Sequence, residues 1–332
     1  MTLNTATPAA LIALDWGTSS LRAYLLDQTG RTLCVRPLPW GIMRLPEARP
    51  GEKSSAHPHA GFEIAFNEAC GDWLREKPAL PVIACGMVGS AQGWREAAYL
   101  DVPVGLSGVA QLMTKIERAG QATIHIVPGL IQRGELPNVM RGEETQIAGI
   151  LAMRPSDGAD LLIGLPGTHS KWVHVHDGQV NHFDTYMTGE VYAALRDHTI
   201  LGRTMNSDAP ADAQGFARGL AVASLPEGRA GLLSTLFSTR ALGLTGQLDG
   251  NAQPDYLSGL LIGYEVASVL ALHRARGALP HIVLCGQDAL CQRYVQALRL
   301  YGADKPELAP HATELGLWHL AQAAGLVPAA TT

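Results

Sequence analysis

An aspartate followed by a Gly-Thr-Ser turn ends the first apolar run of the chain, at residues 11–14. Glycine lets a backbone approach an anion closely, turn amides and hydroxyls donate to phosphate oxygens, and a carboxylate can hold magnesium through water. We therefore expect Asp15 to bind magnesium and the transferred phosphoryl group to contact Gly17, Thr18 and Ser19. An ordinary hairpin would show the same pattern, so that interpretation stays open.

A second turn of the same kind lies in the other half of the chain, where the apolar run 161–165 leads into Pro-Gly-Thr-His-Ser-Lys at 166–171. Leu165-Pro166 stands where the first turn has Asp15-Trp16, so only the first half can hold the metal through this aspartate. The lysine would either neutralise phosphate charge or lie in solvent. The residues expected to bind phosphate here are Gly167, Thr168, His169, Ser170 and Lys171.

Two adjacent glutamates open a predicted helix after Met140-Arg141-Gly142. Phosphoryl transfer to an alcohol needs a group that accepts or orients the hydroxyl proton. Acids at a helix start are also favoured by the helix dipole, which is the alternative explanation. Spacing does not choose between the two; we favour Glu144 as the base, with Glu143 supporting magnesium or water beside Asp15.

A glycine-rich loop at 86–96 carries hydrogen-bonding side chains and one tryptophan. Gln92 and Glu96 are suited to binding substrate hydroxyls, and Trp94 to covering the face of a sugar. Arg95 or Arg141 is suited to binding a substrate carboxylate. A turn with the tryptophan packed into the core would explain the same residues. The predicted substrate-binding residues are Gln92, Gly93, Trp94, Arg95, Glu96 and Arg141.

A second strand-to-helix connection, near the C-terminus, is suited to adenosine or phosphate, because helix N-termini bind anions. A plain connection would look identical. The residues concerned are Gly286, Gln287 and Asp288. The His57-Pro58-His59 segment indicates an exposed loop rather than a metal site.

The elements that must position these residues recur with a fixed offset: Gly167 follows Gly17 by 150 residues, and Asp177 follows Asp27 by the same interval. Each half begins with three short strands in a meander, and later has a buried strand ending at a glycine, at 82–86 and 282–286. Helices are predicted at 62–77, 106–119, 143–153, 188–198, 210–223, 229–241, 256–276 and 288–301. This order predicts an α/β protein with a mixed sheet in each of two lobes and the ligand in the crevice between them.

The expected lobes are residues 1–154, with the first turn, the glycine-rich loop and the acid pair, and 155–332, with the second turn and the adenosine residues. The chain of 332 residues is long enough for two cores. Arg154-Pro155-Ser156-Asp157-Gly158 is the best linker by composition, which places a closing hinge within 153–158.

Charge and composition narrow the function further. The net charge of −5 gives no basic field for nucleic acid. The N-terminus lacks a basic signal region, and no run of about eighteen residues is free of polar breaks, so no membrane partner is expected. Five cysteines without C-x-x-C spacing indicate reduced thiols. We expect a cytoplasmic protein with a small-molecule substrate; the oligomeric state, homodimer included, stays open.

The assembled motifs resemble the 2-dehydro-3-deoxygalactonokinase family, within the sugar kinase, heat-shock 70 and actin superfamily. The resemblance runs from about residue 11 to 326 and is carried by D-W-G-T-S-S-L-R-A (15–23), G-M-V-G-S-A-Q-G-W (86–94), M-R-G-E-E-T-Q (140–146), L-P-G-T-H-S-K-W (165–172) and M-T-G-E (187–190). It implies two ribonuclease H-like lobes of the actin-like ATPase fold. It further implies transfer of the γ-phosphate of ATP, with Mg²⁺, to the 6-hydroxyl of 2-dehydro-3-deoxy-D-galactonate in galactonate catabolism.

Two other functions stay open. The Arg-Gly-Glu-Glu segment is also similar to the acidic helix start of exopolyphosphatases of the same superfamily, which would make the protein a phosphohydrolase with water as acceptor. A non-enzymatic nucleotide sensor would use the same lobes to signal. A long anion favours a basic groove, and a sensor favours an added binding region; the sequence indicates neither.

Overall fold

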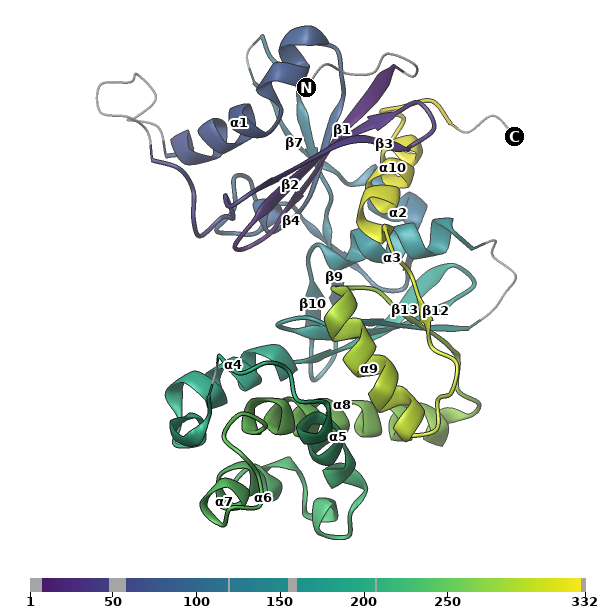
Figure 1. Cartoon of the computed structure of the whole chain (residues 1–332). Helices are drawn as coiled ribbons and strands as arrows, with labels where there is room; N and C mark the ends of the chain where they lie inside the picture. Colours follow the sequence, from purple (N-terminus) through teal and green to yellow (C-terminus); the bar gives the residue numbers. More distant parts are fainter. Residues whose placement is uncertain (1–7, 48–57, 119, 155–159, 207, 330–332) are drawn as a thin grey trace. The chain divides into compact units, whose positions relative to one another are not determined.

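The computed structural model describes residues 8–47, 58–118, 120–154, 160–206 and 208–329. Contacts divide the chain into two compact units. The first comprises Met1–Gly158, His176–His182 and His311–Thr332, and the second comprises Ala159–Val175 and Phe183–Pro310. Figure 1 labels their helices and strands.

A six-stranded mixed sheet forms the centre of the first unit, in the order β3-β2-β1-β4-β8-β7. β1 pairs antiparallel with β2 and parallel with β4, so the meander and the later buried strand lie side by side. The strands are β1 (Ala9–Trp16), β2 (Leu21–Asp27), β3 (Thr32–Leu38), β4 (Val82–Gly86), β7 (Thr114–Ile116) and β8 (Ile124–Ile126). A small second sheet consists of β5 (Tyr99–Asp101), β9 (Gly129–Gln132) and β10 (Asn138–Met140).

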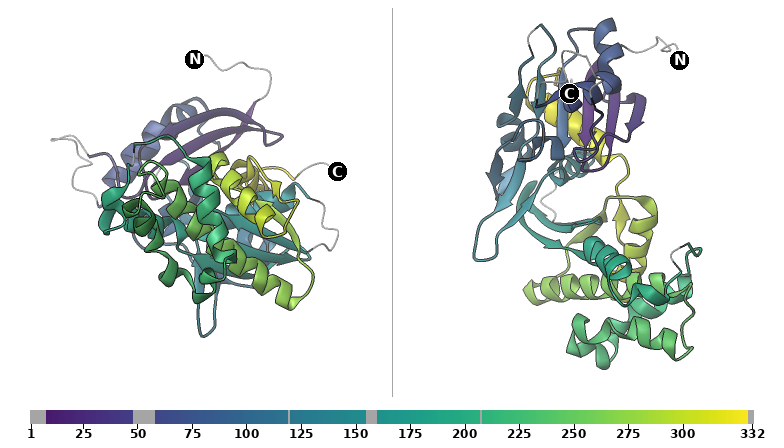
Figure 2. Two further views of the ribbon diagram at one scale, coloured as in Figure 1. Left: turned by 60° about the horizontal axis from the view of Figure 1, so that its bottom comes forward. Right: turned by 90° about the vertical axis from the view of Figure 1, so that its left-hand side faces the viewer.

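The two faces of this sheet have different roles because side chains alternate along a strand. Ile12, Leu14 and Trp16 join a buried core with the apolar face of α1 (Ala60–Glu76). The opposite face carries Ala13 and Asp15, and α10 (Ala312–Ala323) packs against β1 and β4 there. In Figures 1 and 2 this yellow C-terminal helix lies among the purple N-terminal strands.

Glycines let two helices of the first unit approach closely. A β-carbon on Gly149 of α3 (Glu143–Ala152) would overlap the carbonyl oxygen of Ala312, and one on Gly316 of α10 would overlap that of Thr145. Since α3 carries the two glutamates in its first turn, this contact sets the position of the acid pair. α2 (Leu106–Gln111) also packs against α10.

The second unit repeats the strand arrangement of the first. β11 (Leu161–Leu165) pairs antiparallel with β12 (Ser170–His176) and parallel with β14 (His281–Leu284). The sheet order is β15-β14-β11-β12-β13-β6, with β13 (Gln179–Tyr186), β15 (Glu307–Leu308) and β6 (Val104–Gly105); β6 and residues 179–182 of β13 are assigned to the first unit. The predicted duplication and the ribonuclease H-like sheet of each half are therefore confirmed.

Helices make up most of the rest of the second unit. They are α4 (Thr188–His198), α5 (Ala213–Ala221), α6 (Leu232–Thr235), α7 (Ser238–Leu244), α8 (Gln253–Arg276) and α9 (Asp288–Leu300). Short 3-10 turns lie at Gly202–Thr204, Val222–Ser224 and Glu227–Ala230, and another at Met87–Gly89 in the first unit. α8 is long and apolar enough to cross a membrane, yet 67% of its most apolar window is buried within the fold, as in a core helix.

Two of the predicted helices need correction. The helix predicted at 106–119 ends at Gln111, because the following residues extend and pair with β8 as β7. The helix predicted at 229–241 is broken by Gly231, whose φ of 94° is not helical. Neither α10 nor the small β5-β9-β10 sheet was among the predicted elements.

The predicted division of the chain is only partly open to comparison. Contacts place α10 with the first unit, whereas the sequence prediction assigned it to a second lobe of residues 155–332. The proposed hinge falls largely on residues 155–158, which lie outside the described residues, as does His57. The boundary at 154, the hinge and the crevice between the lobes stay predictions.

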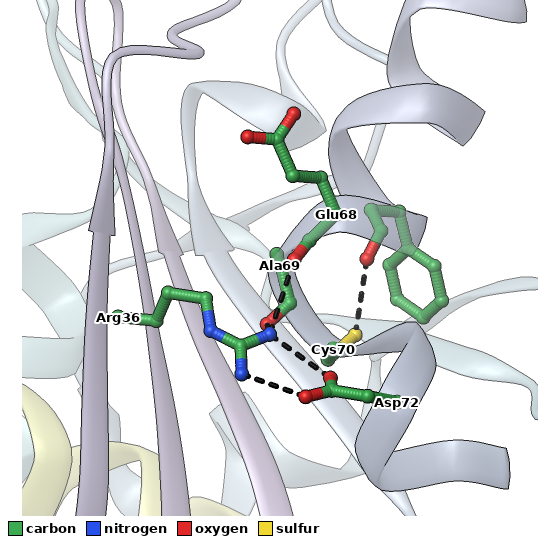
Figure 3. Close-up of polar contacts among 6 residues, drawn as sticks. Arg36, Glu68, Ala69, Cys70 and Asp72 are labelled. Atoms are coloured by element: carbon green, nitrogen blue, oxygen red, sulfur yellow. Dashed lines mark hydrogen bonds and ion pairs between the residues drawn. The ribbon is translucent and has the colours of Figure 1, made fainter. Parts of the chain in front are cut away.

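Arg36 fastens the outer strand β3 to α1. Its guanidinium donates to both carboxylate oxygens of Asp72, at 2.9 and 2.8 Å, and to the carbonyl oxygens of Glu68 and Ala69 (Figure 3). It also lies 4.6 Å above the ring of Trp73. The hydrogen bonds from Arg36 hold the pKa of Asp72 below its ordinary value of 3.8.

We predict that Asp72→Asn lowers the free energy of unfolding by about 1 kcal/mol at pH 7, a modest value because the pair is partly exposed. A carboxyl with a depressed folded pKa stabilises fully above its unfolded pKa and loses this effect as the pH falls through the folded value. Urea unfolding at pH 7 and at successively lower pH should therefore show the difference shrinking below about pH 4. A difference that stays constant would contradict this account.

We predict that Gly316→Ala destabilises the protein by about 1–3 kcal/mol through overpacking against α3, although alanine is normally the better helix residue. Gly134→Ala is the matched control, because no heavy atom lies within 4 Å of a β-carbon built there. Thermal unfolding of both variants checks the prediction. Equal stability of the two variants would mean that the α3–α10 contact relaxes without cost.

Candidate active site

The first turn connects β1 to β2 and is held on both sides. The amide of Gly17 donates to the carbonyl oxygen of Ser20 at 2.9 Å, while Thr18 and Ser19 are exposed. A segment after β3 supports the turn, because the amides of Ile42 and Met43 donate to its carbonyl oxygens at 3.1 Å. The residues at the tip of the turn, Thr18 and Ser19, are therefore exposed to solvent.

Asp15 lies at the end of β1, directly beside Cys85 of β4 and Arg22 of β2 in the strand register. Its side chain is 29% exposed, and the Arg22 guanidinium is 3.8 Å from the carboxylate. Burial raises the pKa of Asp15, the Arg22 charge opposes this, and the Glu314 carboxylate of α10 adds to it. A carboxylate whose negative charge is poorly compensated is a good partner for a cation.

Three backbone segments meet next to Asp15. Gly86 ends β4 with a φ of 89°, and a β-carbon there would lie 2.8 Å from the carbonyl oxygen of Trp16. Gly142, with a φ of 109°, precedes α3, and a β-carbon on it would lie 3.3 Å from the α-carbon of Gly86. Both positions require glycine, since side chains rarely adopt such φ values.

The acid pair starts α3 at this meeting point. Glu143 accepts a hydrogen bond from the Arg141 amide at 3.0 Å, and Glu144 accepts one from the Gly142 amide at 2.7 Å. These bonds satisfy free amides at the helix start, as the alternative explanation requires. Glu144, however, is only 2% exposed, and burial followed by the Glu143 charge raises its pKa to about 8.

The charges of Asp15 and Glu144 both act on the Cys85 thiol. Burial raises the pKa of this thiol well above its ordinary value, and the charges of Asp15 and Glu144 raise it further. Both carboxylates are thus close to one sulfur atom at the end of β4. The structure brings together the aspartate, the first turn and the glutamate pair, which the sequence separates by about 130 residues.

The predicted substrate-binding residues differ in their exposure to solvent. Gln92, Arg95 and Glu96 are exposed, and Gly93 turns the loop tightly against Met87 and Val88. Trp94 is 5% exposed and stacks on Phe62, with ring centroids 5.7 Å apart, so the core explanation describes it better.

Arg141 is also turned inward. It is 9% exposed, donates to the Ala97 carbonyl oxygen at 2.8 Å, and lies 4.3 Å above the ring of Tyr99. Its Nε and Nη1 atoms are buried and make no hydrogen bond within the described residues.

The second turn is anchored within its own unit. Thr168 and His169 are exposed, and the His169 imidazole contacts the Glu190 carboxylate of α4. Ser170 is buried and bonds to the Tyr294 hydroxyl at 2.9 Å. Lys171 is 5% exposed and donates to Thr185 at 2.9 Å, so the suggestion of a solvated lysine is wrong.

The predicted adenosine residues lie next to this turn. A β-carbon on Gly286 would lie 3.2 Å from the Pro166 carbonyl oxygen, and exposed Gln287 and Asp288 begin α9. A nearby cavity of about 240 Å³ is lined by Gly167, Ser258, Leu261, Arg293 and Tyr294, among others. Its mixture of apolar and hydrogen-bonding walls is suited to a nucleoside.

Known proteins match nearly the whole chain. The family described as DGOK, 2-keto-3-deoxy-galactonokinase, matches residues 15–320. The chain belongs to the 2-keto-3-deoxy-galactonokinase family. The 2-dehydro-3-deoxygalactonokinase of Escherichia coli (strain K12) is 38% identical over 301 residues, covering 89% of this chain and 91% of that protein. The "Probable 2-dehydro-3-deoxygalactonokinase DgoK1" of Rhizobium meliloti (strain 1021) is 38% identical over 300 residues, covering 87% and 89%.

A solved structure of the same family agrees with the fold. It comes from a Sinorhizobium meliloti protein described as a candidate 2-dehydro-3-deoxygalactonokinase. Its TM-score is 0.81 at 34% identity, and the match covers 94% of this chain and 98% of that one. The predicted family resemblance and the predicted fold class are both confirmed.

A magnesium ion in this kinase family member would need oxygen ligands. Among the described residues, no group of three or more His, Cys, Asp and Glu side chains is placed to hold a metal. Magnesium commonly uses one or two carboxylates, water and the phosphates of its nucleotide, and the under-compensated Asp15 carboxylate fits that role. Glu143 lies in the same corner but is bonded to the helix start.

Local sequence patterns do not indicate several other residues of the candidate site. Gly41 supports the first turn, since a β-carbon there would overlap the turn backbone, and its only sequence signal is a glycine soon after a strand. The Glu314 charge acts on Asp15 from α10, nearly 300 residues away in the chain, and no local sequence pattern indicates this. The Met-Thr-Gly-Glu motif was noticed only as part of the family resemblance.

We predict that Glu144→Gln lowers turnover by at least about a hundredfold, because it removes the proposed base. It should not destabilise the fold. A carboxyl with a raised folded pKa costs stability increasingly as pH rises from its unfolded value of 4.5 to about 8. Thermal unfolding without ligands should therefore show the variant to be at least as stable as the wild type at pH 8, and indistinguishable from it near pH 4.5.

Asp15→Asn provides the second arm of this test, with a comparable loss of turnover expected. Near wild-type turnover in either variant would remove that residue from the mechanism. Glu143→Gln, compared under the same conditions, assigns the base: if this variant loses more turnover than Glu144→Gln, the roles of the two glutamates are reversed.

Proposed function

We propose that this protein transfers the γ-phosphoryl group of ATP to the 6-hydroxyl of 2-dehydro-3-deoxy-D-galactonate. The relatives' names specify this sugar acid, and the match extends over about nine tenths of the chain and of each relative. The observation that carries the proposal is the corner of the first unit where the end of β1 with Asp15, the end of β4 and the start of α3 with Glu144 come together. Such a corner combines a cation-binding carboxylate with a potential base.

The acceptor side of the reaction is assigned to the acid pair. Glu144 would take the proton of the attacking hydroxyl, because a pKa raised towards 8 gives its carboxylate a stronger affinity for protons than an ordinary glutamate has. Glu143 increases that affinity through its charge. Exposed Gln92, Arg95 and Glu96, in the loop after β4, are the proposed contacts to the sugar acid.

The nucleotide side is assigned to the two turns. The amides and hydroxyls of the first turn would contact the transferred phosphoryl group, and those of the second turn the other phosphates. Bound magnesium would neutralise phosphate charge, with Asp15 holding it through water. The cavity beside Gly167 and the start of α9 would receive adenosine, with Gly286, Gln287 and Asp288 at its edge.

The two alternatives lack comparable support. Both curated relatives are named as kinases, and neither a polyphosphate hydrolase nor a sensor is among the relatives reported above. We place the protein in galactonate catabolism in the cytoplasm, acting on a small molecule.

The test is ADP release with Mg²⁺ and ATP, comparing 2-dehydro-3-deoxy-galactonate, its gluconate epimer, common hexoses and no acceptor. We expect turnover only with the keto-deoxy acids, and faster with the galactonate form. Because one substrate stereocentre can be read by a single hydrogen bond, a preference of about tenfold or more is expected.

Equal ADP release without an acceptor would overturn the kinase proposal in favour of a hydrolase. A polyphosphate assay would then identify the substrate. Preference for the gluconate epimer would retain the kinase activity but reject the proposed acceptor.

A further inference from the structure

A buried carboxylate in the second unit joins four elements around the second turn. Glu265 of α8 is 3% exposed and accepts hydrogen bonds from Trp172 Nε1 at 2.8 Å, from the Tyr294 hydroxyl at 2.8 Å, and from the Thr188 hydroxyl. These donors come from β12, α9 and α4. A charged acceptor in a low-dielectric interior strengthens each bond and makes any loss costly.

The network continues into the turn itself. Because Tyr294 donates its proton to Glu265, its oxygen accepts from the Ser170 hydroxyl, 2.9 Å away. Ser170 ends the turn of residues 166–170, so a directed chain runs from the turn through Tyr294 to Glu265. Burial raises the pKa of Glu265, and the hydrogen bonds from Thr188, Trp172 and Tyr294 oppose this rise.

The start of α4 holds the other side of the turn. The Glu190 amide donates to the Thr168 carbonyl oxygen at 3.0 Å, and the Glu190 carboxylate contacts His169. Gly189 fits only because it lacks a side chain, since a β-carbon would lie 2.5 Å from the Gly167 carbonyl oxygen. Thr188, one residue earlier, is itself bonded to Glu265. Glu265 therefore fixes both the turn and the helix start that clamps it.

We propose that Glu265 is a positioning residue for phosphate binding. It holds the Gly167–Ser170 turn and the first turn of α4 in the conformation that contacts the phosphates of ATP. The inference rests on the proposed function, which takes this turn as a phosphate contact. Its location supports the role: Thr188 and Tyr294 both line the 240 Å³ cavity together with Gly167, so the network forms part of that cavity's wall.

The decisive variant is Glu265→Gln, which keeps the shape but removes one acceptor. Thr188 and Tyr294 donate to the same carboxylate oxygen, Oε2, whereas the Trp172 indole, which can only donate, needs the other, so the amide nitrogen would face both hydroxyls and both would have to turn round to accept. If the Tyr294 hydroxyl turned round, it would donate to Ser170 instead of accepting from it. The direction of the hydrogen bonds that orient the turn would then be reversed. Tyr294→Phe cuts the same chain while leaving the Trp172 and Thr188 bonds, and so provides a second arm if the glutamine variant fails to fold.

Tyr301→Phe is the matched control. Its hydroxyl also makes one hydrogen bond inside the second unit, to the Leu220 carbonyl oxygen at 2.6 Å, and Tyr301 packs against the same apolar core as Tyr294. Within the part of the chain that the structure describes, the Tyr301 hydroxyl makes no hydrogen bond to the turn. All three variants change one polar atom or remove one hydroxyl, which makes their thermal stabilities comparable.

The experiment measures ATP binding by calorimetry with Mg²⁺, and the KM for ATP and for the sugar acid. We expect Glu265→Gln and Tyr294→Phe to weaken ATP binding about tenfold, the effect of one well-oriented hydrogen bond, with the sugar-acid KM unchanged. Tyr301→Phe should bind ATP as the wild type does. Melting temperatures should differ by only a few degrees.

Two results would overturn the inference. Glu265→Gln and Tyr294→Phe could bind ATP as tightly as the control, or both KM values could rise together, which would mark a merely structural residue. Calorimetry separates this failure from that of the proposed function, because it needs no acceptor. A wild-type protein that binds ATP but phosphorylates no sugar acid would reject the proposed acceptor and leave the positioning role measurable, and one that binds no ATP would reject both proposals.

Discussion

Close backbone approach at glycine is the constraint on which the rest of the first unit depends. Gly86 and Gly142 let the end of β4 meet both β1 and the start of α3, while Gly149 and Gly316 bring α3 against α10. Any side chain at these points would force the segments apart. Since Asp15, Glu144 and Glu314 are each carried by one of the segments that meet here, the separation of their charges is set by this packing.

Each unit also buries a glutamate carboxylate, and burial disfavours the charged form of that group. Glu144 in the first unit and Glu265 in the second are both less than 4% exposed, and burial raises the pKa of each. Their surroundings differ. Glu265 accepts hydrogen bonds from three side-chain donors. Glu144 accepts one from the Gly142 amide and a longer one, at 3.3 Å, from the hydroxyl of the adjacent Thr145. The first arrangement suits a fixed structural charge, and the second suits a group that exchanges a proton.

The internal duplication explains why the two units use the same strand order for different tasks. Both place a turn after the first strand, but the first turn follows an aspartate and the second follows Leu165-Pro166. The second turn is instead held by residues from α4, α8 and α9. The same sheet arrangement therefore carries a cluster of carboxylates in the first unit and a turn held by side-chain hydrogen bonds in the second.

Local sequence was sufficient for the meanders, the two turns and the acidic helix start, because alternating apolar residues, Gly-Thr turns and acids in a first helical turn act over a few residues. The same local patterns did not tell whether Trp94, Arg141 and Lys171 face solvent or the interior. All three are buried, and their partners, Phe62, Tyr99 and Thr185, lie 14 or more residues away in the chain. Likewise, only the fold brings α10 and Glu314 to Asp15, and Glu265 to Ser170. Contacts between distant segments depend on how whole elements pack, and no short stretch of sequence contains that information.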